Sequence, residues 1–239
     1  MIPKTIHYCW FGRNPLPALA MKCIDSWRKY LPDYEIIEWN ENNFDVKSIP
    51  YTAEAYAAGK YAFVSDYARF WILYEYGGLY FDTDVEVIKP MTDIIAAGSF
   101  FGAEIDGDAA KSIMPKVAPG LCIGAEKGMP VFKAVLDKYA ILDFYDSDGT
   151  FNKYTMIPLV TDILIAGGMQ PHNRVQRVGD VTVYPAEYFN PLDAPTGRLT
   201  LTPNTRSIHW FMASWLPVQP IWKKKAKQYI RRILYLFKK

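Results

Sequence analysis

Residues 65–87 constrain the fold more than any other stretch of the chain. They read SDYARFWILYEYGGLYFDTDVEV. An apolar run with helical spacing ends at Gly77-Gly78, and an extended segment containing Asp82-Thr83-Asp84 follows. Side chains alternate between the two faces of a strand, so a strand over 79–87 would point Asp82 and Asp84 the same way. Two buried carboxylates that converge require a cation or a ligand donor between them.

The two aspartates have two interpretations. On an edge strand they would be solvated acids without a function, whereas in a central strand they would face a ligand. The central strand is favoured by the apolar residues around them, which are Leu79, Tyr80, Phe81, Val85 and Val87. Carboxylate oxygens are hard ligands that select Mg²⁺ or Mn²⁺, and these ions also coordinate phosphate oxygens. We therefore expect the stretch to hold a divalent metal and a nucleotide-diphosphate sugar.

Asp66 and Arg69 lie three residues apart, and thus on one face of the helix predicted over 60–76. On a solvated face they would form an ion pair worth only ~0.3–0.5 kcal/mol. The helix is apolar nearly all round, which favours a pair that is buried or faces a cleft. In a cleft, Arg69 could contact a phosphate or a sugar hydroxyl, and Asp66 could accept from sugar hydroxyls.

Two further segments carry candidate ligand contacts. Trp10 ends the first predicted strand, and ligands of open α/β sheets bind beyond the carboxyl ends of the strands. Trp10 is either a core residue or a platform on which a nucleobase stacks. Near the C-terminus, SIHWFMASW places His209 before an aromatic loop that could close over a ligand. A lone histidine is more often structural, so the spacing of His209 alone is a weak signal.

The order of predicted elements indicates an α/β fold. A strand over 4–9, a helix over 15–30 and a strand over 34–39 predict a parallel pair. Loops are expected at 106–119, 143–153 and 187–203. The remaining pattern predicts helices at 52–59, 60–76, 93–97, 129–141 and 156–166, and strands at 79–87, 99–104, 120–125, 181–184 and 207–211.

Composition excludes several classes of protein. The 239 residues suffice for one sizeable domain, alone or with an appendage. Three cysteines without paired spacing argue against a disulfide framework or a zinc site, and for a reducing compartment. The N-terminus lacks the pattern of a signal peptide, and no apolar run reaches the ~20 residues that span a bilayer. We expect a cytoplasmic protein.

Charge is concentrated at the C-terminus. Residues 223–239 contain eight basic residues and no acid, which leaves 19 basic and 25 acidic residues in the body. A mildly acidic body argues against binding of nucleic acid. The segment 222–239 also has apolar residues at helical spacing. It would either pack on the body as a terminal helix or lie on anionic lipids at the inner face of the plasma membrane.

Four segments together carry a resemblance: IPKTIHYCWFG, SDYAR, YGGLYFDTDVEV and IHWFMASW. In this order they resemble glycosyltransferase family 32, the sugar transferases with an Asp-x-Asp motif. The family includes the yeast initiating α-1,6-mannosyltransferase and bacterial capsular-polysaccharide transferases, and the catalytic domains of large clostridial glucosylating toxins are similar. The resemblance covers most of residues 2–216 and is strongest at 2–12 and 61–90.

The resemblance implies an α/β fold of the GT-A type, with a Rossmann-like mixed sheet flanked by helices, over residues 1–216. A basic amphipathic helix is expected over 217–239. It further implies Mn²⁺ or Mg²⁺, and transfer of a hexose from a UDP- or GDP-linked donor with retention of configuration. The acceptor would be a saccharide or a lipid-linked saccharide, in the synthesis of cell-surface polysaccharide. The segment 106–198 matches poorly, which leaves the sugar, the nucleotide and the acceptor open.

The resemblance also assigns roles by position. Trp10 matches a base-stacking tryptophan, Asp66 and Arg69 a sugar-contacting pair, and Asp82 and Asp84 the metal and ribose carboxylates. Ser214 and Trp215 match a loop that touches the metal and the leaving diphosphate. The resulting assignments are catalysis for Asp66, Arg69, Asp84 and Trp215; donor binding for Trp10, Asp66, Arg69, Asp82, Ser214 and Trp215; and metal binding for Asp82, Asp84, His209 and Ser214.

Two other functions fit the same residues. The site could hydrolyse a nucleotide sugar, or it could bind one without catalysis. The intact Asp-x-Asp motif and the Ser214-Trp215 pair favour transfer. No carboxylate stands out in the sequence as a nucleophile, so we expect same-face attack, with the leaving phosphate assisting the acceptor.

Overall fold

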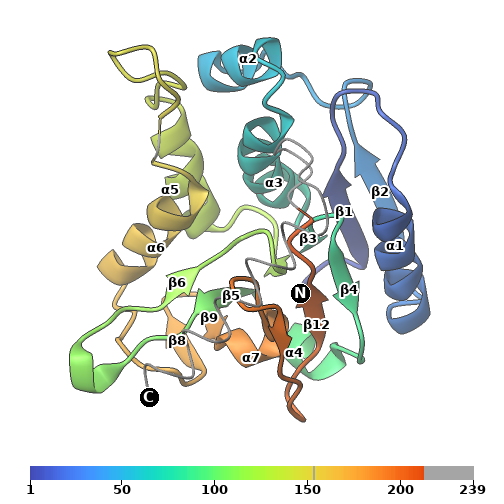
Figure 1. Cartoon of the computed structure of the whole chain (residues 1–239), viewed down its shortest axis with the longest axis vertical. Helices are drawn as coiled ribbons and strands as arrows, with labels where there is room; N and C mark the ends of the chain where they lie inside the picture. Colours follow the sequence, from blue (N-terminus) through green and yellow to red (C-terminus); the bar gives the residue numbers. More distant parts are fainter. Residues whose placement is uncertain (153, 213–239) are drawn as a thin grey trace.

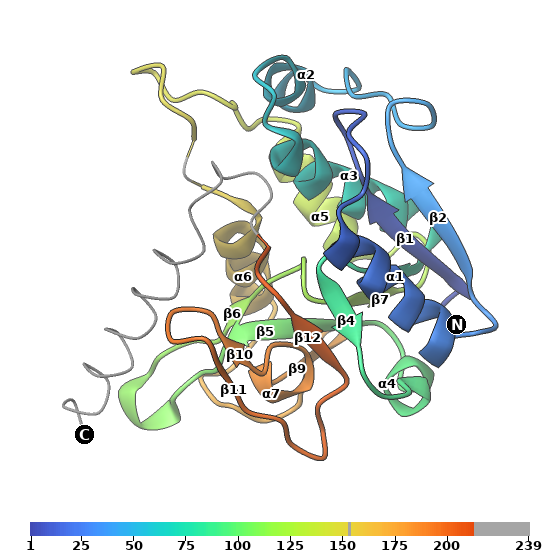
Figure 2. The ribbon, with the colours of Figure 1, turned by 45° about the vertical axis from the view of Figure 1, so that its right-hand side comes forward.

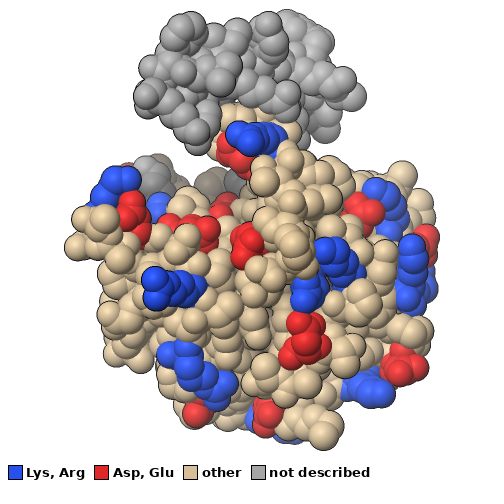
Figure 3. All heavy atoms as spheres, turned by 90° about the horizontal axis from the view of Figure 1, so that it is seen from below, with Lys and Arg blue, Asp and Glu red and all other residues tan. Residues whose placement is uncertain are grey.

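A computed structural model describes residues 1–152 and 154–212 of the chain. Ser214, Trp215 and the predicted helix over 217–239 lie outside the described residues. Within the described residues no helix is long and apolar enough to cross a bilayer. On the face seen in Figure 3, basic and acidic residues are interspersed. The absence of nucleic acid among the partners stays a prediction.

A mixed sheet forms the centre of the fold (Figure 1). Strand β1 pairs in parallel with β2 and β3, whereas β7 is antiparallel to both β3 and β5. Strands β1, β3 and β5 therefore run the same way, and their carboxyl ends meet at one edge. The order is β2 (Glu35–Trp39), β1 (Thr5–Cys9), β3 (Gly78–Tyr80), β7 (Ile123–Ala125), β5 (Phe100–Ile105), β9 (Val181–Tyr184) and β8 (Gln176–Val178), with β6 (Lys116–Val117) paired to β5.

Helices cover both faces of this sheet (Figures 1 and 2). One face packs against α2 (Pro50–Ala57), α3 (Tyr61–Tyr76), α5 (Pro130–Tyr139) and α6 (Met156–Ala166). The other packs against α1 (Ala18–Tyr30), α4 (Thr92–Ala96), α7 (Ala186–Phe189) and a two-stranded ribbon of β4 (Val85–Val87) and β12 (Ser207–His209). Outside these layers lie a 3₁₀ turn η1 (Ala109–Lys111) and a hairpin of β10 (Leu192–Asp193) and β11 (Arg198–Leu199).

The apolar pattern of the strands explains the two layers. Leu79 and Phe100 belong to the core beneath α1, whereas their neighbours Tyr80 and Phe101 belong to the core beneath α3 and α5. Both faces of a central strand are buried, so its sequence is a continuous apolar run. The predicted β-α-β unit is confirmed, because β1 and β2 pair in parallel from Thr5↔Glu35 to Cys9↔Trp39.

The strand predicted over 79–87 is wrong. The chain leaves the main sheet after Tyr80, forms a turn in which Val85 N–H donates to the Asp82 carbonyl at 3.0 Å, and then starts β4. Strand β4 pairs with β12, so the predicted final core strand over 207–211 is likewise outside the main sheet. The loop expected at 187–203 contains part of α7 and the β10–β11 hairpin. Strands β4 and β12 pair over a long sequence separation, which short-range periodicity does not encode.

A buried histidine fixes the junction between α3 and β3. The helix ends at Gly77 as predicted, but Gly77 has φ 67° and ψ −160°, which is not the left-handed helical conformation that was expected and is a region open essentially only to glycine. A Cβ on Gly78 would lie 2.7 Å from the Thr5 carbonyl and 3.0 Å from His7 Nε2. His7 Nδ1 accepts from Trp39 Nε1 at 3.1 Å, so Nε2 carries the proton and donates to the Gly77 carbonyl at 3.0 Å. Burial lowers the pKa of His7 to about 4, although the Gly77 bond opposes the shift.

We expect His7 to make the fold acid-sensitive. Below pH ~6.5 the unfolded chain takes up a proton that folded His7 does not accept until about pH 4, so unfolding becomes easier as pH falls through that window. The loss amounts to about 3 kcal/mol at most. Asp66 makes unfolding harder as pH falls, because its pKa is raised to about 6 in the fold. The pH dependence of the wild type alone would therefore mix the two effects. The measurement is therefore the difference in urea-unfolding free energy between the wild type and His7→Gln. A difference that does not change between pH 7 and pH 4 contradicts the prediction.

Candidate functional site

A pocket of about 750 Å³ opens at the edge where β1, β3 and β5 end. Ligands of open α/β sheets bind at this edge because the strands and helices leave a crevice there. The sides of the pocket come from α3, from the start of α6 and from the chain that follows β12. Its lining includes Trp10, Asp66, Arg69, Asp82, Asp84, Glu104 and His209. The structure thus brings together every described residue that the sequence assigned to the site.

Arg69 lies at the bottom of the pocket between two carboxylates. Its Nη2 is 2.9 Å from Asp66 Oδ1 and 3.2 Å from Asp82 Oδ1, and its side chain is only 3% exposed. The guanidinium also lies over the Tyr80 ring, and its Nε donates to the Ser65 carbonyl. The solvated ion pair considered for Asp66 and Arg69 is therefore excluded. Within the described part of the chain the buried Nη1 has no hydrogen-bond partner, so the N–H donors on this nitrogen are unsatisfied.

The charges at this position do not balance. Two carboxylates share one guanidinium, and burial makes their charged forms costly. Burial raises the pKa of Asp66 to about 6, although Arg69 opposes the shift and Asp82 adds to it. Burial also raises the pKa of Asp82, with Asp84 adding to the shift. A cation bound beside Asp82 would remove part of this cost.

Asp84 is held by three groups. His209 Nε2 lies 3.0 Å from Asp84 Oδ1, and because a carboxylate only accepts, the ring nitrogen donates. The Met212 amide donates to Oδ2 at 2.7 Å, and the Trp210 amide donates to the Asp84 carbonyl. Burial alone would raise the pKa of Asp84, but the bonds from His209 and Met212 lower it. The pKa of His209 is raised by Asp84 against the effect of burial.

The turn at 81–84 and strand β12 bring three ligand atoms together. One atom each from Asp82, Asp84 and His209 lies within 4.8 Å of the other two. Two carboxylates and an imidazole make a donor set that suits a divalent cation such as Mn²⁺. The buried, unpartnered Nδ1 of His209 shows that the described protein groups do not complete the hydrogen bonding here. The donor set therefore fits a metal site, although the strand argument that led to it was wrong.

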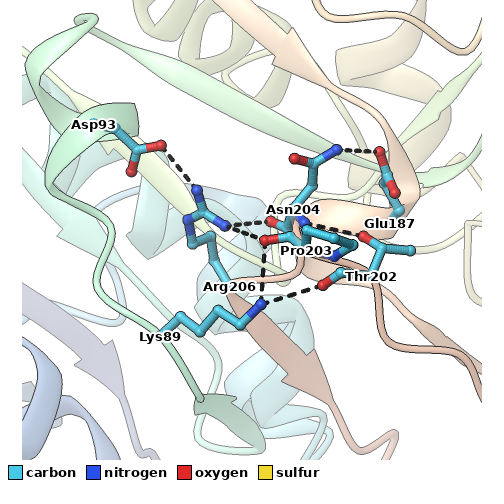
Figure 4. Close-up of polar contacts among 7 residues, drawn as sticks. All are labelled: Lys89, Asp93, Glu187, Thr202, Pro203, Asn204 and Arg206. Carbon is cyan, nitrogen blue, oxygen red and sulfur yellow. Dashed lines mark hydrogen bonds and ion pairs between the residues drawn. The ribbon is translucent and has the colours of Figure 1, made fainter.

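Polar contacts from Lys89 and Arg206 form a clamp on the loop at 202–206, which precedes β12 (Figure 4). Lys89 Nζ donates to the carbonyls of Thr202 and Pro203, and Arg206 donates to the carbonyls of Pro203 and Asn204 and pairs with Asp93 at 2.8 Å. Strand β12 then pairs with β4 in the register His209↔Val85. This register places the imidazole beside Asp84, although the two residues are far apart in sequence.

Trp10 lies at the mouth of the pocket directly after β1. Its amide donates to the Trp39 carbonyl, and its Nε1 donates to the Asn14 carbonyl at 2.6 Å, so the indole is held by its polar edge. The side chain is partly exposed and lines the pocket. A fully enclosed core tryptophan is thereby excluded, and part of the side chain faces the pocket. Base stacking by Trp10 stays a prediction.

Sequence reasoning missed several contributors to the site. Tyr80 donates from its hydroxyl to Asp82 Oδ1 at 3.2 Å, and the Met212 amide binds Asp84. Gly120 accepts from the Asp82 amide and leaves space for the Asp82 carboxylate. Glu104 lines the pocket from the end of β5. For Gly120 the sequence did offer a signal, namely the run of small residues at 120–125. A glycine in or beside a strand often marks the close approach of another group.

Residues 17–101 match the family described as "Glycosyltransferase sugar-binding region containing DXD motif". This stretch of the chain is similar to the sugar-binding region of the DXD glycosyltransferases. The match includes Asp66, Arg69, Asp82 and Asp84, which are four of the residues that meet in the pocket.

Two curated proteins extend the comparison. Inositol phosphoceramide mannosyltransferase 1 of Schizosaccharomyces pombe is 32% identical over 110 residues, which make up 41% of this chain and 33% of that protein. The chain thus matches only a third of that relative's length. Uncharacterized glycosyltransferase L373 of Acanthamoeba polyphaga mimivirus is 26% identical over 205 residues, or 82% of this chain and 78% of that protein.

A solved structure resembles the fold over nearly the whole chain. It is the crystal structure of a glycosyltransferase involved in the glycosylation of the major capsid of PBCV-1, with a TM-score of 0.50 and 13% identity. The alignment covers 95% of this chain and 100% of that one. At this identity the likeness concerns the fold alone. The predicted α/β fold of the GT-A type is confirmed.

We expect Gly120→Ala to weaken the metal site without unfolding the protein. The added Cβ would lie 2.1 Å from Asp82 Oδ2 and 3.2 Å from Arg69 Nη1, so the carboxylate must move. Loss of a group that supports a ligand costs roughly 10–100-fold in metal affinity. Titration with Mn²⁺ by calorimetry measures the change. Gly102→Ala is the matched control, because its Cβ would press on Phe189 in the core instead. Unchanged Mn²⁺ affinity in Gly120→Ala contradicts the assignment of Asp82.

Proposed function

We propose that the protein is a metal-dependent retaining glycosyltransferase that moves a hexose from a UDP- or GDP-linked donor to a saccharide or lipid-linked saccharide. The observation that carries the proposal is the convergence of Asp82, Asp84 and His209 in a pocket that also contains Trp10 and a buried Arg69. The family match over residues 17–101 supports the sugar-binding part. A role in cell-surface polysaccharide synthesis is part of the same proposal.

Each group has a role in this proposal. Asp82, Asp84 and His209 would hold Mn²⁺ or Mg²⁺, with Ser214 as a further ligand. The ion would neutralise charge that develops on the departing diphosphate. Trp10 would stack on the base, and Ser214 and Trp215 would contact the diphosphate. The donor sugar would lie over Arg69 and Asp66, where the free Nη1 of Arg69 donates and Asp66 accepts.

The acceptor would attack from the face that the diphosphate leaves. The bond from the acceptor oxygen to the anomeric carbon forms as the bond from that carbon to the diphosphate breaks, and the departing phosphate takes the acceptor proton. Asp66, Asp82 and Asp84 are each engaged by Arg69 or His209, so the proposal gives none of these three aspartates the role of a nucleophile. A trapped glycosyl-enzyme adduct would contradict it.

We expect Asp84→Ala to abolish metal-dependent release of nucleoside diphosphate while the protein stays folded. The loss should exceed the roughly 10–100-fold that removal of a supporting residue costs, because a ligand itself is removed. The assay uses UDP-glucose and GDP-mannose with Mn²⁺, before and after chelation, and compares turnover with and without saccharide to separate transfer from hydrolysis. Asp33→Ala, at a side chain that is 76% exposed, is the control. Full activity of Asp84→Ala would sink the site assignment.

The basic segment 222–239 is proposed to bring the enzyme to anionic lipids, where a lipid-linked acceptor would be found. Its basic residues alternate with an apolar face in the sequence, and each basic residue near such a surface contributes ~1 kcal/mol. We expect the full chain to cosediment with phosphatidylserine vesicles and not with phosphatidylcholine vesicles, and deletion of 222–239 to remove this binding. Equal binding by the full and the shortened chain refutes the proposal.

A further inference from the structure

One carboxylate of the pocket has no part in the proposed site. The acidic residues that line the pocket are Asp66, Asp82, Asp84 and Glu104. Arg69 pairs with Asp66 and Asp82, and His209 pairs with Asp84. Among the described residues the structure records no hydrogen bond or ion pair for the Glu104 carboxylate, which is partly exposed. An unpaired acid in a pocket can accept hydrogen bonds from a ligand.

The backbone directs Glu104 into the pocket. The register between β5 and β6 shifts between Ala103 and Ile105, which is a β-bulge at Glu104. Bulges beside active sites turn a side chain away from the direction that regular alternation gives it. The bulge is held in place, because the Glu104 carbonyl accepts from Asn190 Nδ2 at 3.0 Å and the Asp106 carboxylate accepts from the Ala186 amide at 2.8 Å. The carboxylate itself stays free.

The position of Glu104 along the sheet edge separates it from Trp10, the proposed base contact. Trp10 follows β1, Asp82 follows β3, and Glu104 lies at the end of β5. Strand β7 lies between β3 and β5, so β1 and β5 are three strand spacings apart, or ~14 Å. Trp10 thus lies toward one side of the pocket and Asp82 toward its middle. Glu104 enters from the β5 side, close enough to His209 for their charges to interact, and Thr155, Met156 and Ile157 also line the pocket.

We propose that Glu104 binds a hydroxyl group of the saccharide acceptor and so orients the acceptor for attack. This inference rests on the proposed function, since it assumes that the donor lies between Trp10 and Arg69. A carboxylate with free lone pairs suits a neutral polyol, and a hydrogen bond between a charged and a neutral group is among the stronger ones. The carboxylate would repel a diphosphate, which also assigns this side of the pocket to the uncharged partner.

The test separates the acceptor from the donor. Glu104→Ala, Glu104→Gln and the control Glu126→Ala are assayed with Mn²⁺, the better of UDP-glucose and GDP-mannose, and the methyl glycoside that gives the highest wild-type turnover. Glu126 follows β7 and does not line this pocket. Circular dichroism verifies that each variant is folded.

We expect the KM for the glycoside to rise about tenfold or more in Glu104→Ala and by less in Glu104→Gln, which keeps an acceptor oxygen. The KM for the donor and the release of nucleoside diphosphate into water without acceptor should not change. An unchanged glycoside KM in Glu104→Ala, or a donor KM that rises with it, overturns the inference. A wild type that neither binds nor turns over nucleotide sugars overturns the proposed function instead.

Discussion

The site depends on one buried cation, the guanidinium of Arg69. It touches two carboxylates from different elements, Asp66 on its own helix and Asp82 after β3, and is almost fully enclosed. Isolated charges in such surroundings are costly, so each charge makes the others tolerable. Arg69, Asp66 and Asp82 together have one negative charge in excess when both carboxylates are ionised. Asp84 and His209 line the same pocket. This excess negative charge lowers the stability of the empty pocket, and it makes the pocket suited to a divalent cation and a phosphate.

Three further devices hold this charged group in place. Gly120 leaves space for the Asp82 carboxylate, where any side chain would clash. His7 keeps the junction of α3 and β3 closed through bonds to Trp39 and Gly77. The carbonyl clamp of Lys89 and Arg206 fixes the loop that leads to His209 (Figure 4). None of the three is proposed to bind the ligand through a side chain, so substitutions there should change metal or donor binding through the geometry of the site.

The sequence predicted much of this from local signals. The β-α-β unit, the long buried helix α3, its end at Gly77 and the α/β class all follow from apolar periodicity and turn chemistry over fewer than 40 residues. The pair Asp66 and Arg69 was recognisable because charged side chains on an otherwise apolar helix are costly to bury unless they pair or bind a ligand. The expected strand over 79–87 failed because turn and strand share an apolar pattern here, and β4 is defined by its partner β12 rather than by its own residues.

The sequence by itself determined which residues are candidates for the chemistry. Asp66, Arg69, Asp82 and Asp84 are charged residues in apolar surroundings, and that pattern can be read locally. His209 became a candidate mainly through the resemblance. The tertiary structure decided how they meet. The turn at 81–84, the register of β12 and the approach of Gly120 each join segments from different parts of the chain. The unpaired state of Glu104 was also decided there, because whether an acid finds a partner depends on what the fold packs around it.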